Sequence, residues 1–328
     1  MPIAYNEVSE KSSGGTELQA RTLEKLLPPD LLSEFQIIPS RVRKLDPDKI
    51  RILWCHDLPE DPESVHLKDG GWKKFHMIVF VSHWQAQLYI QKFNIPWDKT
   101  VVIRNAIVPL PELEKPTDEV RVIYHTTPHR GLEILVPVFE KLASERMTTN
   151  LHLDVFSSYS IYGWENRDKH YEALFDKIRA HPDMTYHGVV DNETVKQHVA
   201  KAHIFAYPSI WPETSCISLI EAMSGKCLCV HPDFAALPET AASWTTMYRW
   251  SENINTHAGR FYSMLGASID YVSHPNSGWD DRTNIQKKYI DTFYSWDVRK
   301  MEWQRLLESL LKEDRALPVD ESYTYRVG

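Results

Sequence analysis

The stretch that most constrains the fold is residues 204–230, which read IFAYPSIWPETSCISLIEAMSGKCLCV. An apolar run at 204–207 is followed by two proline breakers, a helical pattern from about 215 to 225, and a second apolar run at 227–230. This is the order strand, loop, helix, strand, with almost no spare residues between the elements. Because open α/β sheets bind ligands at the carboxyl ends of their parallel strands, we expect the loop of this unit to form part of a binding site.

The same alternation extends over much of the chain. It predicts strands at 36–39, 50–55, 76–82, 101–103, 120–124, 151–156 and 184–188, with helices at 12–27, 83–93, 132–146, 168–179, 193–201, 284–293 and 298–311. Thr16 is a candidate cap for the first helix and Ser82 for the second. Strands that alternate with helices favour parallel sheets with right-handed crossovers, so we predict an α/β fold.

Length favours two domains. The chain has 328 residues, 42% of them hydrophobic, and a single domain commonly holds about 100–200 residues. The proline-rich and acidic segment 109–116 is the best linker candidate. The segment 2–5 is long enough only for a short first strand.

Composition excludes several kinds of partner. The net charge is −8 without a basic block, which argues against nucleic acid and anionic lipid. No leader pattern and no apolar run of roughly 18 residues is present, so we expect a cytoplasmic protein without integral membrane association. Its four cysteines lie in or beside apolar runs and are expected to be reduced and buried, and no metal-binding spacing of histidines is evident.

Two carboxylates frame the helix of the 204–230 unit. Glu213 lies in the loop and Glu221 two helical turns into the helix. Between them lie the amides of Thr214, Ser215, Cys216 and Ile217, at the positive end of the helix, which suits phosphate or sugar hydroxyls. One acid can then face a sugar while the other reaches a ribose; the alternative is a solvated loop acid and an ordinary helix acid.

This pattern resembles the donor-site motif of retaining family-4 glycosyltransferases with the GT-B fold. The shared features are a Glu, seven residues, a second Glu followed by Ala-Met, and the preceding Ala-Tyr-Pro-Ser. The sequence departs from the family where Thr214, Ser215 and Cys216 replace the usual glycines. The resemblance implies two Rossmann-like parallel-sheet domains facing a cleft. Residues 1–110 would form the acceptor-side domain, completed by helices from 285–328, and residues 111–284 the donor domain.

Other segments carry the same resemblance. Arg130 before a glycine matches the basic residue that binds the donor diphosphate, while His125 stands near the place of a second arginine of the family. Gly14 and Gly15 resemble the glycine loop of the first domain, although a plain capping turn is an open alternative. By the same resemblance, His187 and Gly188 would meet the nucleotide base through the main chain. His56 would lie near the transferred sugar, with Asp57 fixing its tautomer; a surface histidine in a turn is the alternative.

The resemblance implies a retaining glycosyltransferase that moves a sugar from a nucleotide-diphosphate sugar to an acceptor hydroxyl, in glycan or polysaccharide synthesis. Glu213, His56 and Arg130 are the expected catalytic residues. We expect no cofactor and no metal ion, because arginine and helix amides can neutralise the diphosphate. A nucleotide-sugar epimerase on the same fold and a non-catalytic nucleotide-sugar-binding partner subunit stay open as alternatives.

Overall fold

The computed structural model describes residues 14–146 and 149–312, so the expected short strand at 2–5 lies outside the described residues. The chain divides into two compact units. The first unit comprises Met1–Ala106 and Trp296–Gly328, and the second comprises Ile107–Ser295. The expected limit at 110 lies four residues after the observed one, and the expected limit at 284 lies eleven residues before the observed one, so residues 285–295 belong to the second unit.

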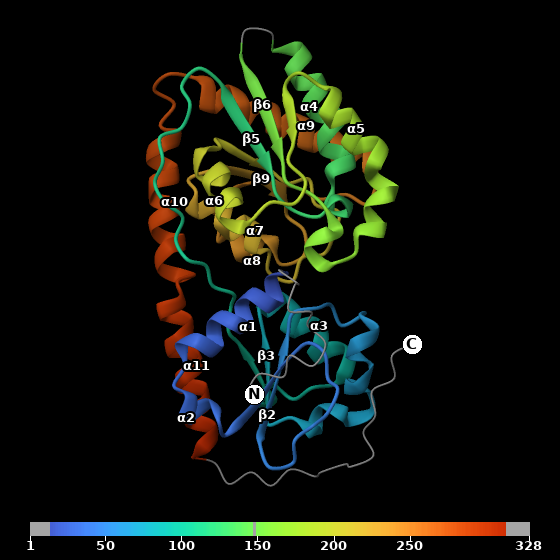
Figure 1. Ribbon diagram of the computed structural model, residues 1–328, viewed down its shortest axis with the longest axis vertical. Helices are drawn as coiled ribbons and strands as arrows, with labels where there is room; N and C mark the ends of the chain where they lie inside the picture. Colours follow the sequence, from blue (N-terminus) through green and yellow to red (C-terminus); the bar gives the residue numbers. More distant parts are fainter. Residues whose placement is uncertain (1–13, 147–148, 313–328) are drawn as a thin grey trace. The chain divides into compact units, whose positions relative to one another are not determined.

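The first unit is built on a four-stranded parallel sheet in the order β1-β2-β3-β4 (Figure 1). The strands are β1 (Phe35–Pro39), β2 (Ile50–Cys55), β3 (Met77–Phe80) and β4 (Thr100–Val102). Its helices are α1 (Gly15–Leu26), α2 (Pro29–Leu32), α3 (His83–Phe93) and α11 (Trp296–Leu311), with 3₁₀ segments at η1 (Pro62–Lys74) and η2 (Trp97–Lys99).

Both faces of this sheet are buried, which explains why its strands read as apolar runs rather than as an alternating pattern. Side chains of one parity, such as Ile52 and Trp54, pack with α1 and α11. Side chains of the other parity, such as Leu53 and Cys55, pack with α3. Trp303 of α11 meets Trp54 edge to face at 4.9 Å, so the last described helix completes the core of the first unit.

The second unit contains a six-stranded sheet in the order β10-β9-β8-β5-β6-β7, with every pair parallel. The strands are β5 (Val120–Tyr124), β6 (Leu151–Val155), β7 (Met184–Tyr186), β8 (Ile204–Ala206), β9 (Leu228–Pro232) and β10 (Thr246–Tyr248). The chain first builds outward from β5 to β6 and β7, and then returns to place β8 on the other side of β5. The gap between β5 and β8 is therefore the topological switch point of the sheet.

Helices connect these strands (Figure 1). They are α4 (Leu132–Glu145), α5 (Glu172–Ala180), α6 (Asn192–Lys201), α7 (Ile217–Ser224), α8 (Leu237–Ala241), α9 (Ile254–Ser273) and α10 (Trp279–Phe293), with 3₁₀ segments η3 (Pro128–Arg130), η4 (Tyr159–Tyr162) and η5 (Glu165–Tyr171). α4 packs with α9, and α7 packs with α6 and α10. One continuous apolar core joins these helices to the sheet.

Most predicted elements are confirmed within a few residues, and three details are wrong. The helix expected at 168–179 is split into η5 and α5, and β10 was not predicted. The N-cap of α1 is Gly14, without a side-chain cap, rather than Thr16. By contrast, the Ser82 hydroxyl does accept a hydrogen bond from the Gln85 amide at the start of α3.

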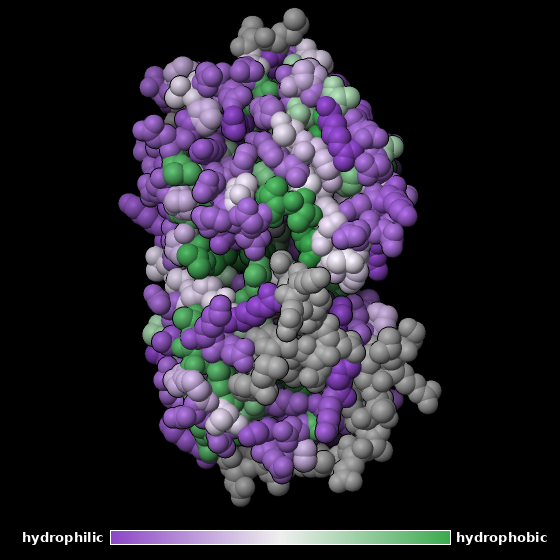
Figure 2. Space-filling model, in the orientation of Figure 1, coloured by the Kyte–Doolittle hydropathy of each residue, from purple (hydrophilic) through white to green (hydrophobic). Residues whose placement is uncertain are grey.

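The cysteine prediction is also confirmed, since Cys55, Cys216, Cys227 and Cys229 are free and buried. Across residues 14–146 and 149–312, we find no helix whose length and apolar character would let it cross a bilayer. The face shown in Figure 2 is mainly hydrophilic, with hydrophobic residues in small groups.

Candidate functional site

Two loops meet at the switch point of the second unit. One follows β5 and ends at Gly131, and the other follows β8 and contains Pro208. Gly131 has φ of +118°, and a Cβ atom added to it would lie 2.2 Å from the Pro208 carbonyl oxygen. Only glycine adopts this backbone without strain and leaves room for the neighbouring carbonyl. The glycine that follows Arg130 therefore lets the two loops come into direct contact.

Arg130 and Glu213 form an ion pair across these loops. Arg130 Nη1 lies 2.5 Å from Glu213 Oε1, and the two side chains are only 21% and 6% exposed. The Tyr207 hydroxyl donates a second hydrogen bond to the same carboxylate oxygen. Burial alone would lower the pKa of Arg130, but the Glu213 carboxylate raises it well above its ordinary value. The structure thus brings together two of the predicted site residues as a buried ion pair.

Several buried polar atoms in the segments that follow β5 and β6 have no protein hydrogen-bond partner among the described residues. They are Thr127 Oγ1, His129 Nδ1, Arg130 Nε and Ser157 Oγ. Thr127 and Ser157 are each 2% exposed, and they follow the neighbouring strands β5 and β6. Buried polar groups in native proteins are nearly always hydrogen-bonded, so a group left over needs an explanation such as a ligand. This edge of the sheet therefore offers donors that a polar ligand can satisfy.

The predicted helix after the loop begins at Ile217. Cys216, its N-cap, has φ of +76°, so a left-handed backbone persists at a position where the family uses glycine. Thr214 and Ser215 form the turn before it, and the Ser215 carbonyl accepts a hydrogen bond from the Thr240 hydroxyl. In the first helical turn, the Ser218 hydroxyl donates a hydrogen bond to the His125 carbonyl at 3.2 Å, which places the start of α7 beside the loop that follows β5.

Glu221 lies on α7 and is partly buried. Burial raises its pKa to about 7, opposed by the positive charge of Lys196 on α6. Burial raises the pKa of the Cys216 thiol, and the charges of Glu213 and Glu221 raise it further, whereas Arg130 lowers it. The thiol is therefore within electrostatic range of all three charged residues. The three predicted charged residues therefore all lie near Cys216 instead of on unrelated surfaces.

Aromatic side chains that the sequence reading did not assign also line this region. His129 stacks on Tyr159 with ring centroids 5.3 Å apart and meets Trp211 edge to face at 4.9 Å. Burial, followed by the charge of Arg130, lowers the pKa of His129 to about 4, so the ring is neutral at physiological pH. Two features of the sequence could have identified these residues. His129 directly precedes Arg130, and Tyr207, which donates to Glu213, is the tyrosine of Ala-Tyr-Pro-Ser.

His187 and Gly188 follow β7. His187 Nε2 lies 2.7 Å from Asp154 Oδ1, and its ring stacks on Phe156 with centroids 4.1 Å apart and planes 5° from parallel. Gly188 has φ of +64°, which glycine adopts at no steric cost. The His187 side chain thus holds the turn at the carboxyl edge of β6 and β7, although His187 was expected to contribute only through its main chain.

The remaining predicted residues belong to the first unit and are described within it. Gly14 is the N-cap of α1, and Gly15 is its first residue. His56 follows β2 and packs on Trp54 with ring centroids 4.5 Å apart. Burial lowers the pKa of His56 to about 3, so its imidazole is neutral, as a proton acceptor requires. The His56 amide donates to the Ser40 hydroxyl at 2.9 Å. Burial raises the pKa of the neighbouring Asp57.

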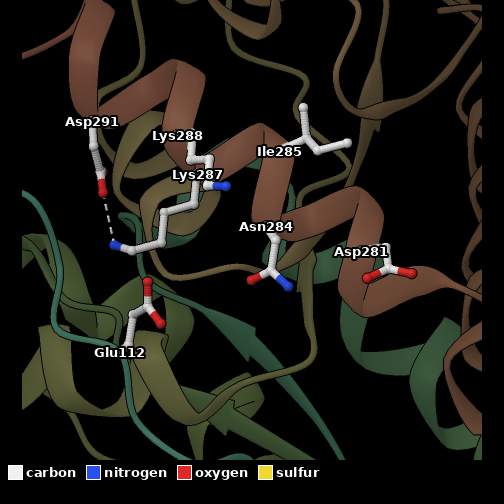
Figure 3. Close-up of a pocket in the computed structure, with 7 residues that line it drawn as sticks. All are labelled: Glu112, Asp281, Asn284, Ile285, Lys287, Lys288 and Asp291. Atoms are coloured by element: carbon white, nitrogen blue, oxygen red, sulfur yellow. Dashed lines mark ion pairs between the residues drawn. The ribbon is translucent and has the colours of Figure 1, made fainter.

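A separate pocket of about 560 Å³ lies beside α10. Its lining consists of Glu112, Asp281, Asn284, Ile285, Lys287, Lys288 and Asp291 (Figure 3). Lys287 is paired with Asp291 at 2.8 Å and also donates to the Leu110 and Ser224 carbonyls. Because the Lys287 ammonium group already has these partners, we interpret its contacts as structural. The pocket contains none of the predicted site residues.

Comparison with known proteins decides the class of the protein. Residues 121–253 match the family described as "Glycosyl transferases group 1". The protein is a glycosyltransferase. The matched segment begins in β5 and ends just before α9, so it includes Arg130, Glu213 and Glu221 together with both loops of the switch point.

Solved structures show that this glycosyltransferase has the GT-B fold. A glycosyltransferase from Rickettsia africae aligns with a TM-score of 0.65 and 14% identity, over 92% of this chain and 81% of the other. A sucrose-phosphate synthase from Thermosynechococcus elongatus aligns with a TM-score of 0.62 and 14% identity, over 90% and 79%. A UDP-forming trehalose-phosphate synthase from Burkholderia xenovorans aligns with a TM-score of 0.63 and 12% identity, over 91% of this chain and 78% of the other. No curated protein matches the sequence.

Proposed function

We propose that the protein transfers a sugar from a nucleotide-diphosphate sugar to an acceptor hydroxyl with retention of configuration, in glycan or polysaccharide synthesis. One observation supports this most: the buried Arg130–Glu213 pair at the β5/β8 switch point, with buried polar atoms that lack a described partner in the segments after β5 and β6. A cation and a carboxylate side by side suit a donor whose diphosphate is anionic and whose sugar carries hydroxyls and gains positive charge as the bond breaks.

Each group has a defined part in this proposal. The bond between the anomeric carbon and the diphosphate oxygen breaks, and its electron pair leaves with the diphosphate. Arg130 uses Nη1 for Glu213, which leaves its Nε–H and other donors for diphosphate oxygens, as the fixed fork of a guanidinium allows. The amides at the start of α4 and α7 add positive potential. We propose that these groups neutralise the diphosphate without a metal ion.

The carboxylates recognise the rest of the donor. Glu213 is fixed by Arg130 and Tyr207 and is proposed to hold sugar hydroxyls and to offset charge at the anomeric carbon. Glu221 is proposed to accept hydrogen bonds from the ribose hydroxyls, and the His187–Gly188 turn to meet the base. In the first unit, Gly14 and Gly15 are proposed to bind the donor at its diphosphate, and His56 is proposed to lie near the transferred sugar and to accept the proton of the acceptor hydroxyl.

The test uses two arginine variants of the full chain. Arg130→Ala removes the proposed diphosphate ligand. Arg146→Ala is the matched control: Arg146 is paired with Asp270 at 2.8 Å at the other end of α4, about 21 Å away along a 14-residue helix. A thermal-shift screen of nucleotide-diphosphate sugars first identifies the donor, since a ligand at 100 times its Kd stabilises by about 2.7 kcal/mol.

With that donor, Arg130→Ala should lower turnover by roughly 10²–10³, as is typical for loss of one preorganised charge-stabilising group. Arg146→Ala should stay within about threefold of the parent. Equal turnover in all three proteins would remove Arg130 from the site. Release of sugar or nucleotide without any acceptor would instead indicate an epimerase, and tight donor binding without acceptor-dependent release would indicate a non-catalytic partner.

A further inference from the structure

Three side chains from separate elements converge at the edge of the second unit formed by β6 and β7. Asp154 lies on β6, His187 follows β7 and His198 lies on α6. We propose that Asp154, His187 and His198 bind a divalent transition-metal cation, with Zn²⁺ as the best-suited ion. The proposal concerns a structural cation and goes beyond the proposed function, which assigns no metal to glycosyl transfer.

The distances support a shared cation. The candidate ligand atoms of the three residues all lie within 4.8 Å of one another. Asp154 Oδ1 is 2.7 Å from His187 Nε2 and 3.8 Å from His198 Nδ1. In a tetrahedral zinc site with bonds of about 2.05 Å, ligand atoms are about 3.3 Å apart. The two Asp154–histidine distances therefore differ from this spacing by only about half an ångström, one shorter and one longer.

A third imidazole, which would be a fourth ligand, stands within reach. His152 Nε2 lies 3.9 Å from the same Asp154 oxygen and 3.0 Å from Thr185 Oγ1. Residues 152 and 154 share one face of β6 because side chains alternate along a strand. Three histidine nitrogens thus surround one carboxylate oxygen, which is more than one hydrogen-bonded pair requires. Imidazole nitrogen with carboxylate oxygen is a ligand set that suits zinc.

The surrounding packing holds the ligands in place. Asp154 is paired in register with Thr185 of β7, and the His187 amide donates to the Val155 carbonyl at 2.9 Å. Phe156 stacks on the His187 ring and meets the His198 ring edge to face at 5.0 Å. Ring orientation fixed by neighbours is what a metal site needs from its supporting residues.

One oxygen of Asp154 is left for the histidines. Arg121 Nη1 lies 3.8 Å from Oδ2 of Asp154, and Arg121 is itself paired with Glu119. Oδ1 of Asp154 is therefore the oxygen that the histidine nitrogens share.

His198 gives the independent indication of a ligand. Its Nδ1 is buried and has no hydrogen-bond partner within residues 14–146 and 149–312, although it faces the cluster. A bound cation would satisfy this nitrogen and would tie α6 and the His187–Gly188 turn to the sheet. The expected consequence is a metal-dependent gain in stability of the second unit rather than a chemical step.

Calorimetry with ZnCl₂ on the chelator-treated full chain tests the proposal. We expect one Zn²⁺ per chain, retained after dialysis and counted by mass spectrometry of the metal, together with a higher melting temperature. Co²⁺ in place of Zn²⁺ should give the visible absorption of a tetrahedral site. His198→Ala should weaken binding at least 100-fold, since even a lost outer contact typically costs 10–100-fold.

His170→Ala is the matched control, because His170 is an exposed histidine of the same unit outside the cluster. It should bind Zn²⁺ as the parent does. The melting temperature of His198→Ala in chelator, compared with that of the chelator-treated parent, shows whether this variant is folded. A parent that binds no stoichiometric Zn²⁺, or a folded His198→Ala that binds as tightly as His170→Ala, would show that the cluster holds only an Asp154–His187 hydrogen bond.

Discussion

Glu221 gives the prediction that can be worked out furthest from the structure. Burial raises its pKa from 4.5 to about 7, so the carboxyl group changes charge in the physiological range. If the ionised form accepts the ribose hydroxyls, donor affinity depends on the ionised fraction. With a pKa of 7, that fraction is about one eleventh at pH 6 and about ten elevenths at pH 8. Donor binding should therefore tighten by about tenfold between these two pH values.

The same shift predicts the pH dependence of stability. Because the folded state holds the proton more tightly than the unfolded chain, the parent should lose stability as pH rises from about 4.5 to about 7, and stay at the lower level above that. A rise in pKa from 4.5 to about 7 corresponds to at most about 3 kcal/mol. Glu221→Gln, which cannot ionise, should lack this loss.

The assay measures donor affinity by calorimetry and thermal unfolding of the parent and Glu221→Gln at matched pH values. The difference between the two proteins isolates Glu221 from all other titrating groups. We expect a flat affinity profile for the variant, and a melting temperature that exceeds that of the parent increasingly as pH rises from about 4.5 to about 7 and stays above it at higher pH. Parallel profiles for both proteins would refute the assignment of Glu221 to the ribose and its shifted pKa.

Two further predictions concern the scaffold. Gly131→Ala should destabilise the protein by several kcal/mol, because the new methyl group would lie 2.2 Å from the Pro208 carbonyl oxygen. Gly163 has a similar left-handed backbone but open space around it, so Gly163→Ala should cost only about 1–2 kcal/mol. Equal melting temperatures of the two variants would contradict the loop contact. Trp303→Ala should cost about 3–5 kcal/mol and Met301→Ala, half exposed on the same helix, less than about 0.5 kcal/mol; chemical denaturation compares them, and equal effects would show that α11 does not complete the first unit's core.

The sequence allowed the main elements of the donor region to be predicted because their signals are local. The apolar runs at 204–207 and 227–230 are realised as β8 and β9, and the helical pattern between them as α7. The breakers Pro208 and Pro212 lie in the intervening loop. The errors arose where local signals compete: a 3₁₀ segment precedes α5, and three-residue β10 is too short to show a period.

The site itself was predictable as a set of residues but not as a geometry. The spacing of Glu213 and Glu221 and the position of Arg130 pointed to one site, yet nothing local says that Arg130 and Glu213 pair directly. That contact depends on strand order, which places β8 beside β5. The Asp154, His187 and His198 cluster was missed for the same reason, since its members come from two strand ends and a helix rather than from one spaced motif.

The most direct test of the central claim is a crystal structure of the protein with a nucleoside diphosphate. We predict diphosphate oxygens at charge-assisted hydrogen-bond distance, about 2.7–2.9 Å, from Arg130 nitrogens, with the amides at the start of α7 beside them and the ribose at Glu221. A diphosphate bound elsewhere, with Arg130 still paired only to Glu213, would contradict the account.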